Sequence, residues 1–513
     1  MGQTIGIDLG TTYSAAAVMD ATGTPKILTN QDGEPVTPSV VLFQNFGQGD
    51  EPLVGVQAKN MATAAPDDVV QYVKRQIGDP DWRFDSSTGQ SYTAEEISAI
   101  ILRRIKAGAE AALGAPVDNA VITVPAYFDD ARRVATRQAG EMAGLNVLRV
   151  LNEPTSAALS YGLESKDAQT VLVYDLGGGT FDVTVLKIDH GNFDVIGTDG
   201  DRNLGGFDFD NQIALLLADA LTDQGAMIAL EDTTTLALLR EKAEQAKRAL
   251  SSVDKTSVHL SHQGRQFRVN LTRHQFEERC ADLLKRTEEI AEDVLSDAGM
   301  RWADVDQVLM IGGSTRMPMV PALLERLTGT KPVHHVNPDE AVALGAAIQA
   351  AMEMTLEPMA YDGADATSGL SGSISISDVT SQALGVLALD DRHELANFTV
   401  IPRNAKIPAR GTESLVTTGP RTDLRIEVTQ GDDNNPDFVT KIGEGILQLK
   451  APVDTGYAFN VTYHYDIDQT VFVEVNDAGT GALIGTFDID RESNLNEDQV
   501  HHNRRKLESL NIE

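Results

Sequence analysis

The sequence is short of cysteine, of positive charge and of long apolar runs. Its 513 residues hold a single cysteine, Cys280, so no intramolecular disulfide can form, which fits a reducing compartment. Lys and Arg number 42 against 76 Asp and Glu, giving a net charge of −34. A surface this acidic repels nucleic acid and anionic membranes. We therefore expect neither as a partner, and we expect Cys280 to be a packed thiol in the amphipathic run 276–295.

Two further absences narrow the class of protein. No apolar run approaches the roughly 18–20 residues needed to span a bilayer, and no basic region followed by an apolar stretch precedes the first strand-like segment, residues 4–9. The expected location is therefore cytoplasmic. The G-x-x-x-x-G-K-S/T motif is also missing, which excludes a P-loop as the means of holding phosphate.

The chain divides into an α/β part and an all-β part. Up to about residue 351, strand-like runs such as 120–124 alternate with helical patterns such as 130–143, which is typical of α/β architecture. After a stretch at 361–372 rich in Gly, Ser, Ala and Asp, short alternating runs such as 459–465 are separated by turn-forming residues. We expect four segments: an α/β domain at 1–355, a linker at 356–378, a β-sandwich at 379–490 and a short polar tail at 491–513, whose order the composition leaves open.

Two segments of the α/β part resemble each other. Residues 5–14 read IGIDLGTTYS, and residues 171–182 read VLVYDLGGGTFD. Each is an apolar strand followed by Asp-Leu-Gly, by small hydroxyl residues and by another strand-like run. Such repetition at long spacing indicates two duplicated half-domains.

The repeated turns have the chemistry of a phosphate site. Glycine lets a turn approach a phosphate closely and aim its N–H groups at the oxygens, and Thr11, Thr12 and Thr180 add hydroxyl donors. Carboxylates beside a polyphosphate would repel it unless a hard cation lay between them. The three aspartates of these turns therefore imply a Mg²⁺ ion that is held partly through water. They are Asp8, Asp175 and Asp182. A lone Asp-Leu-Gly is usually an ordinary β-turn, but two copies and the Gly-Gly turns at 204–207 and 311–316 favour a nucleotide site.

The same residues belong to longer strings that resemble the 70-kDa heat-shock (DnaK-like) chaperone family. Besides the repeated turns, the strings are TPSVV, YVKRQIGD, ITVPAYFDDARR, LNEPTSAALSYG, LGGFDFD, EQAKRALSS, MIGGSTRMPMV and VNPDEAVALGAA, in the family's order from residue 4 to about 352. The resemblance implies an actin-like ATPase domain of two lobes with a nucleotide cleft between them, followed by an all-β sandwich. It also implies ATP or ADP, Mg²⁺ and a potassium ion as cofactors, and a role in protein folding and the stress response.

The resemblance assigns roles within the cleft. Lys74 resembles the catalytic lysine and Glu153 the carboxylate that orders the metal's water shell, with Asp8, Asp182 and Thr180 completing the catalytic set. Arg316 would lie on or beside the purine. Without the family, the helix face at 244–251 would be read as an exposed, salt-bridged surface. The implied nucleotide contacts are Gly10, Thr11, Thr12, Tyr13, Gly177, Gly178, Gly179, Thr180, Gly205, Gly206, Glu244, Lys247, Arg248, Ser251, Gly312, Gly313, Ser314, Arg316 and Asp339.

Coupling between the two parts is also implied by the resemblance. Pro125 and Arg133 resemble a switch that reports nucleotide state between lobes, and Arg149 and Asp477 stand where the family makes an interdomain ion pair. The linker ends at Asp378 in the string ISISD, where serine replaces half of the usual aliphatic side chains. That replacement should weaken docking of the linker on the ATPase domain.

The β-module resembles the family's peptide-binding sandwich more loosely. The implied partner is an extended apolar peptide or unfolded protein, held by backbone hydrogen bonds and an apolar pocket. Leu424 and Ile426 match pocket positions, and Leu415 and Val416 could contribute. An ordinary sandwich core explains these four residues equally well.

The sequence departs from the family in three places. The family's helical lid is absent, so a bound peptide should leave faster. Phe207 stands where the family usually has Glu. The segment 252–269 lacks a longer loop that helps a nucleotide exchange factor to engage. The family implies that factor and a J-domain co-chaperone as partners, and the short segment leaves dependence on the factor open.

The expected function is that of a chaperone that hydrolyses ATP to control weak binding of apolar peptides or unfolded proteins. The alternative is an ATP-switched regulatory protein that docks one dedicated partner through the β-module. The chaperone-type strings disfavour a metabolic kinase of the same fold, and the appended β-module disfavours a filament-forming actin relative. Fold alone could not decide among these functions.

Overall fold

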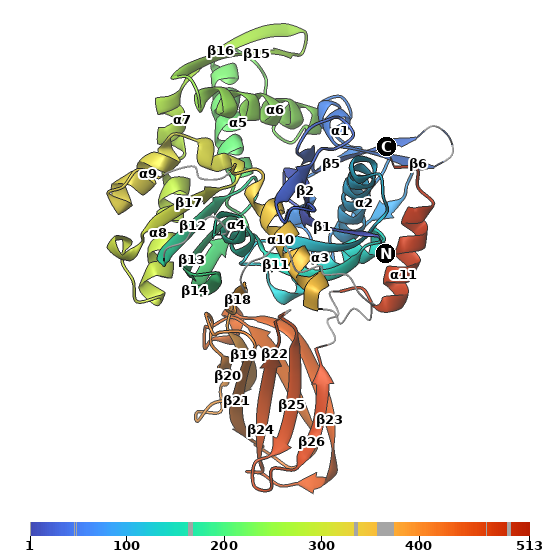
Figure 1. Cartoon of the computed structure of the whole chain (residues 1–513), viewed down its shortest axis with the longest axis vertical. Helices are drawn as coiled ribbons and strands as arrows, with labels where there is room; N and C mark the ends of the chain where they lie inside the picture. The colour runs from blue at the N-terminus through green and yellow to red at the C-terminus, as the bar shows by residue number, and fades with distance from the viewer. Residues whose placement is uncertain are drawn as a thin grey trace.

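The computed structural model describes residues 2–45, 47, 49–162, 168–332, 337–356, 374–467, 469–489 and 494–512. Within them, an α/β part of two lobes precedes a β-rich part (Figure 1). The strand expected at 4–9 is β1 (Gln3–Asp8), and the helix expected at 130–143 is α3 (Asp130–Met142). The expected fold class is confirmed. Most of the predicted linker, residues 357–373, lies outside the described residues, and the four predicted boundaries stay predictions.

Lobe I is built on a mixed sheet with the strand order β11-β10-β1-β2-β3. Strand β1 runs parallel to β10 and antiparallel to β2. Ile5 and Ile7 of β1 are fully buried beneath the helices that cover the sheet. The other elements of lobe I are β2 (Tyr13–Met19), β3 (Pro25–Leu28), β4 (Thr37–Pro38), β5 (Val40–Asn45), β6 (Asp50–Val54), α1 (Val56–Asn60), β7 (Val69–Gln71), η1 (Val73–Arg75), β8 (Phe84–Asp85), β9 (Ser91–Tyr92), α2 (Ala94–Leu113), β10 (Val117–Val124) and β11 (Asn146–Asn152).

Lobe II repeats this arrangement around a second sheet. Strands β12, β13 and β14 form an antiparallel meander, and β17 lies parallel to β12 at its edge, as β10 lies beside β1. The duplication inferred from the two Asp-Leu-Gly turns is thus visible in the topology. The elements are β12 (Gln169–Leu176), β13 (Phe181–Asp189), β14 (Asn192–Asp201), α5 (Gly206–Asp223), α6 (Thr233–Leu250), β15 (Lys255–His262), β16 (Arg265–Thr272), α7 (Arg273–Arg279), α8 (Ala281–Asp297), η2 (Trp302–Asp304), β17 (Gln307–Ile311), η3 (Gly313–Arg316) and α9 (Met319–Thr328).

Two helices join the lobes at the base of the cleft between them. Helix α10 (Ala341–Leu356) packs on β1 and β2 of lobe I and on α4 (Glu153–Gly162), which in turn packs on β12 and β13. The helices approach so closely that a Cβ atom at Gly345 would lie 1.7 Å from the Ser156 carbonyl oxygen. Only glycine fits there.

Elsewhere in lobe II, Cys280 is fully buried, and burial raises the pKa of its thiol to about 12, so the expectation of a packed, unreactive thiol is confirmed.

The β-rich part, called the β-unit from here on, is a sandwich of two antiparallel sheets. One sheet has the order β20-β19-β22-β23 and the other β21-β24-β25-β26. Their inner faces share one apolar core, which includes Val428, Tyr463 and Val473. The strands are β19 (Leu384–Leu389), β20 (Leu395–Ile401), β21 (Ala409–Val416), β22 (Arg421–Gln430), β23 (Thr440–Val453), β24 (Ala458–Tyr465), β25 (Val471–Asp477) and β26 (Leu483–Asp488), with η4 (Pro436–Phe438) before β23.

The segment that precedes the β-unit is docked on lobe II. Strand β18 (Ser375–Ser377) pairs in parallel with the first three residues of β14, and it is the edge strand of that sheet. Ile374 and Ile376 pack against the apolar cluster beneath. Backbone pairing does not depend on side chains, so the two serines that were expected to weaken docking leave this contact intact.

A loop of the β-unit adds charged contacts to lobe II. Arg403 pairs with Asp297 and, at 3.0 Å, with Asp199, while Lys406 pairs with Asp194. Between them, the amide of Thr198 donates to Asn404 Oδ1 at 3.1 Å. These side chains are partly exposed, so each ion pair should contribute only about 0.2–1 kcal/mol and should weaken with salt.

Reversing both charges should loosen the β-unit from lobe II. The double variant Arg403→Glu, Lys406→Glu places new carboxylates beside Asp194, Asp199 and Asp297, so attraction becomes repulsion. We expect a larger maximum dimension in small-angle X-ray scattering and faster proteolysis around residue 378.

The matched control for this variant is Arg425→Glu, Lys441→Glu. These residues pair with Glu427 and Glu444 inside the β-unit, so the control makes the same change in net charge away from lobe II. Equal scattering and equal proteolysis of the two variants would contradict the ionic contribution to docking.

The tail returns to lobe I. Helix α11 (Glu497–Glu508), the only helix that the described residues contain after β26, starts at a capping box formed by Asn496 and Gln499. It packs on α2 and α3, as the red helix in Figure 1 shows. Val500 and Leu507 join the buried cluster that also contains Ile5 and Ile7. The tail is therefore ordered along α11.

Polar contacts fix the register of α11 on lobe I. Gln138 donates to the Leu495 carbonyl at 2.6 Å, and Arg103 donates to the Leu507 carbonyl. Lys506 pairs with the nearly buried Glu96 at 2.8 Å and lies 4.3 Å from the centre of the Tyr92 ring.

Among the helices of the described residues, none has the length and apolar character that crossing a bilayer requires.

Candidate functional site

A cavity of about 550 Å³ lies between the two lobes. Its walls come from the two repeated turns, from η1, from α6 and from the turn after β17. Of the predicted site residues, the cavity is lined by Asp8, Gly10, Thr11, Thr12, Tyr13, Lys74, Glu153, Asp175, Gly177, Gly178, Thr180, Gly206, Glu244, Lys247, Arg248, Ser251, Gly312, Gly313, Ser314, Arg316 and Asp339. Segments separated by more than 300 residues thus meet in one place.

The two Asp-Leu-Gly turns face each other across this cavity. A Cβ atom at Gly178 would lie 2.4 Å from Thr12 Cγ2, and one at Gly179 would lie 2.4 Å from Thr11 Cγ2. The loops can approach this closely only because both positions are glycine. The hydroxyl of Ser314 donates to the Gly177 carbonyl at 2.8 Å, which ties the turn after β17 to the second loop. Backbone amides and hydroxyls converge here from both lobes, as a polyphosphate requires.

Buried acids surround the phosphate loops. Burial, with the charge of Glu153 next, raises the pKa of both Asp8 and Asp182 to about 7. Burial also raises the pKa of Asp175 well above its ordinary value, and the charges of Glu153, Asp182 and Asp8 add to that effect. Four carboxylates that repel one another in a buried site call for a cation.

Lys74 is the only protein cation that directly contacts this group of four acids among the described residues. It lies in η1, is 4% exposed, and its ammonium donates to Glu153 Oε1. A buried ammonium at the end of the cavity can stabilise negative charge that develops on a transferring phosphoryl group. Lys74 and Glu153 therefore lie together at the acidic end of the cavity, and the catalytic roles that the resemblance implies for them stay predictions.

The donor set suits a hydrated Mg²⁺ rather than a fully protein-ligated ion. No three His, Cys, Asp or Glu side chains within the described residues converge as a ready-made metal site. Mg²⁺ commonly keeps several waters and takes one or two carboxylates plus phosphate oxygens. Asp8, Asp175 and Asp182 could hold such an ion through water, and the ion would offset the repulsion among them. When bound, it would neutralise charge on the phosphate oxygens.

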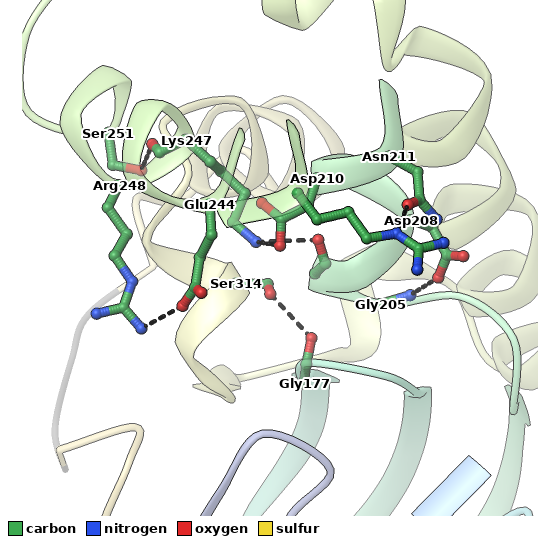
Figure 2. A network of polar contacts seen from close by, with 12 residues as sticks. Gly177, Gly205, Asp208, Asp210, Asn211, Glu244, Lys247, Arg248, Ser251 and Ser314 are labelled. Carbon is green, nitrogen blue, oxygen red and sulfur yellow. Dashed lines mark hydrogen bonds and ion pairs between the residues drawn. The ribbon is translucent and has the colours of Figure 1, made fainter. Parts of the chain in front are cut away.

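The opposite end of the cavity is held by helix α6 and the start of α5 (Figure 2). Lys247 donates to Asp210 Oδ2 at 2.8 Å and to the Gly206 carbonyl at 2.9 Å. Arg248 donates to Glu244 at 2.7 Å. Arg316 and Asp339, 2.8 Å apart, lie partly exposed at the rim. One face of α6 therefore points into the cavity. The spacing of residues 244, 247, 248 and 251 predicted that they share a face, and the resemblance predicted that this face binds the nucleoside.

Three of the residues predicted for the nucleotide site do not line the cavity. Asp182 is 1% exposed and accepts a hydrogen bond from the Tyr127 amide at 2.9 Å. The Gly179 carbonyl accepts from Arg75 Nε at 2.9 Å. Gly205 stacks directly behind Gly179, where a Cβ atom would lie 2.6 Å from the Gly179 backbone. All three support the lining from behind.

The sequence reasoning missed several contacts around the cavity, one of which spans the cleft. Lys59 of lobe I pairs with Glu244 of lobe II at 2.8 Å and donates to the Tyr13 hydroxyl at 3.0 Å. Asp210, which partners Lys247, follows Phe207 and Asp208 in the string LGGFDFD. Lys59 carries no local signal, since it lies on a short helix, but the Asp in a recognised string could have been assigned to the cavity.

A chain of polar contacts connects the cleft to the docked segment before the β-unit. The amide of Tyr127, two residues after Pro125, bonds Asp182. The buried guanidinium of Arg133 donates to the carbonyls of Ala126 and Phe128 and to Asn152 Oδ1 at 2.5 Å. Asn152 in turn donates to Asp378 Oδ2 at 2.8 Å. Pro125, Arg133 and Asp378 are thus brought together.

The other predicted coupling pair is not formed. Arg149 pairs with Glu353 of α10 at 3.2 Å. Asp477 accepts hydrogen bonds from Tyr457 at 2.5 Å and from Thr480 at 2.7 Å within the β-unit. Each residue therefore has a partner in its own part of the chain, and the expected ion pair between Arg149 and Asp477 is absent from this structure.

Docking of the segment before the β-unit should weaken as pH rises. Burial raises the pKa of the Asp378 carboxyl in the docked state, although the Val379 amide, Arg133 and Arg149 oppose the shift. The docked form therefore binds a proton more tightly than the undocked form, so docking is strongest below the ordinary pKa and is lost progressively above it. We expect slower hydrogen exchange of the β18 amides near pH 4, close to the ordinary pKa of an aspartate, than at about pH 8, after correction for intrinsic exchange.

The variant Asp378→Asn tests the cause of this pH dependence. Asparagine keeps an oxygen that can accept from Asn152 but has no proton to bind in this range. An unchanged pH profile in that variant would mean that another group controls docking.

The predicted peptide pocket is a closed core in this structure. Leu424 and Ile426 are 4% and 1% exposed and lie among the inward-facing residues of the sandwich. They face inward because they alternate with Arg425 along β22. Leu415 is partly buried against the same core, and Val416 is 60% exposed on the outer side. Of the two readings that the sequence left open for Leu424 and Ile426, the structure favours the sandwich core.

A comparison with protein-family models agrees with this geometry over nearly the whole chain. The family described as Hsp70 protein matches residues 4–86 and 81–512. The match extends from β1 of lobe I through the β-unit to the docked tail.

Proposed function

This chain belongs to the Hsp70 family, whose members are ATPases that bind ATP or ADP with Mg²⁺, and from that premise we propose what this member does. It binds Mg·ATP in the cleft between the lobes and hydrolyses it to control weak binding of extended apolar peptides or unfolded proteins. The observation that carries the proposal is the pair of phosphate loops, Thr11–Thr12 against Gly178–Gly179, that close on each other beside the buried Lys74.

The chemistry follows from positions of the chain's own groups. Amides and hydroxyls of the two loops would hold the phosphates, and Lys74 would offset charge on the terminal one. The acids around Asp182 would orient the attacking water and the hydrated ion. Glu244, Lys247, Arg248 and Ser251 would hold the nucleoside at the other end, with Arg316 at its rim.

The polar chain from Asp182 to Asp378 supports a link between hydrolysis and the β-unit. A change of charge at the phosphate loops would alter the Asp182–Tyr127 contact, and Arg133 and Asn152 continue from there to the docked segment. Nucleotide would then bias the equilibrium between docked and undocked β-unit.

A dedicated protein partner is the second candidate function. It is favoured by the burial of Leu424 and Ile426, which leaves no open apolar groove at those positions. Large apolar side chains are instead exposed on the outside of the β-unit, at Val416, Phe438, Ile446 and Leu483. Apolar side chains scattered singly over a surface are ordinary, so the burial of Leu424 and Ile426 alone carries this candidate.

The decisive experiment measures ATP turnover with and without a panel of apolar peptides and an unfolded protein, using Lys74→Ala to subtract contaminating activity. Stimulation by several of these ligands would support the chaperone function. Turnover that none of them stimulates, together with one native protein that co-purifies, would support the dedicated partner. Turnover of the unaltered protein no higher than that of a mock purification from cells without the protein would overturn the ATPase proposal itself.

A further inference from the structure

Phe207, at the start of α5, sits among cationic and aromatic groups from both lobes. Its ring centre is 4.6 Å from that of Tyr72, and the guanidinium carbons of Arg75 and Arg240 each lie 4.8 Å from its centre. Tyr72 and Arg75 belong to lobe I, whereas Phe207 and Arg240 belong to lobe II. The stack therefore crosses the cleft.

Both aromatic rings also form part of the wall of the cavity. The backbone of Phe207 is fixed to the second phosphate loop, since its amide donates to the Gly178 carbonyl at 2.8 Å. Tyr72 adopts a left-handed conformation, with φ of 60°, which is uncommon for a non-glycine residue. The fold retains this unfavourable conformation at the position where the Tyr72 ring meets Phe207.

Polar contacts reinforce the stack on one side. Arg75 forms an ion pair with Asp208, and its Nε and Nη2 donate to the Gly179 carbonyl at 2.9 and 2.7 Å. Arg240 is held from lobe II by Asn211 Oδ1 at 3.1 Å. The two guanidinium groups are therefore fixed next to the ring rather than free in solvent, which strengthens a cation–π contact.

We infer that this cross-cleft stack of Tyr72, Phe207, Arg75 and Arg240 is a lock that keeps the lobes closed on bound nucleotide and slows its release. Separating the lobes far enough to empty the cavity would pull Tyr72 and Arg75 away from Phe207. The aromatic pair and the Arg75 cation–π contact would then be lost together, while Arg240 would stay beside Phe207 within lobe II. Lys59–Glu244 is a second, independent cross-cleft contact. The inference rests on the proposed nucleotide site and names a device that governs exit from it.

The chemistry of position 207 explains why phenylalanine matters. A glutamate there, as in the resembling family, would offer the two arginines ion pairs that water and salt weaken. A phenyl ring offers apolar area to Tyr72 and a π face to both guanidinium groups, and these contacts survive at higher ionic strength. The lock should therefore depend little on salt.

The test is displacement of a fluorescent ADP analogue by excess ATP in a stopped-flow instrument. We expect Phe207→Ala to release the analogue at least about tenfold faster than the unaltered protein, with a single binding site and little change in the association rate. Phe207→Leu, which keeps apolar bulk but has no π face, should lie between them. The control is Phe438→Ala, an exposed phenylalanine of the β-unit, which should release at the unaltered rate.

The partner ring provides a second route to the same measurement. Tyr72→Ala should speed release by a smaller factor, because it removes the aromatic pair but leaves the cation–π contacts of Phe207 in place. The double variant Tyr72→Ala, Phe207→Ala should add little to Phe207→Ala alone, because Phe207→Ala already removes the aromatic pair. If Phe207→Ala does not fold, Tyr72→Ala and Phe207→Leu carry the test.

The possible failures are distinguishable. Normal binding with equal release rates for the unaltered protein, Phe207→Ala and Tyr72→Ala would overturn the lock and leave the nucleotide site standing. No binding of the analogue by the unaltered protein would overturn the nucleotide site itself. Fully additive effects of the two substitutions would show that the rings act separately, which would also overturn the lock.

Discussion

Replacing Lys74 by alanine should lower the rate of ATP hydrolysis at least about a hundredfold while ATP remains bound, because removal of one positioned group that stabilises transition-state charge typically costs about 10²–10³ in rate. Lys74 is buried at the acidic end of the cavity beside Glu153. The nucleoside end, around Glu244 and Lys247, is untouched by the change. Single-turnover hydrolysis and calorimetric ATP binding measure the two effects separately.

The substitution also leaves the Glu153 carboxylate buried without its cation, which can destabilise the fold. The double variant Lys74→Ala, Glu153→Gln removes that charge and should be stable but equally inactive. Lys242→Ala, on the outward side of α6 and paired only with neighbours on its own helix, is the control for loss of a lysine. Turnover in Lys74→Ala within a few-fold of the unaltered rate would remove Lys74 from catalysis.

The second large effect concerns the far end of the chain. Leu507→Ala should destabilise lobe I by about 2–5 kcal/mol, the usual cost of emptying a fully buried leucine site. Leu507 is 0% exposed and belongs to the same cluster as Ile5 and Ile7. The core of lobe I loses the Leu507 side chain either when the residue is truncated to alanine or when α11 detaches from the lobe.

Lobe I can be observed by itself because the chain has two tryptophans. Trp82 packs on the lobe I cluster and Trp302 on that of lobe II, so urea unfolding followed by fluorescence in a Trp302→Phe background reports lobe I. His502→Ala, on the exposed side of α11, should change the free energy of unfolding by less than about 0.5 kcal/mol. If Leu507→Ala unfolds at the same urea concentration as His502→Ala, the docked tail does not stabilise lobe I.

Local sequence patterns predicted the turns, helix faces and loops that are set by residues close to one another in the sequence. The two Asp-Leu-Gly turns predicted duplicated half-domains, and the sheets of the two lobes share one topology. Helical spacing placed Lys247 and Arg248 on one face of α6, and the Gly-rich turns predicted both phosphate loops. The resemblance added Lys74 and Glu153, which no local pattern distinguishes from surface charge.

Contacts between distant segments were out of reach of the same reasoning. Lys59–Glu244 and Tyr72–Phe207 each join residues more than 130 positions apart, and no local pattern pairs either residue with its partner. Alternation along β22 correctly predicted that Leu424 and Ile426 share a face, but alternation cannot say whether that face meets a partner sheet or a ligand. The polar composition of the tail likewise hid Val500 and Leu507, two residues that decide its docking.

The shared core of β1 and α11 constrains the order in which the protein matures on the ribosome. Residues 3–142 can assemble early, but the apolar strip that α2 and α3 offer to Val500 and Leu507 stays uncovered until translation has passed residue 507. At elongation rates of about 5–20 residues per second, that interval lasts tens of seconds. A chaperone relative would thus be a potential client during its own synthesis, with the strip on lobe I exposed until α11 has been made.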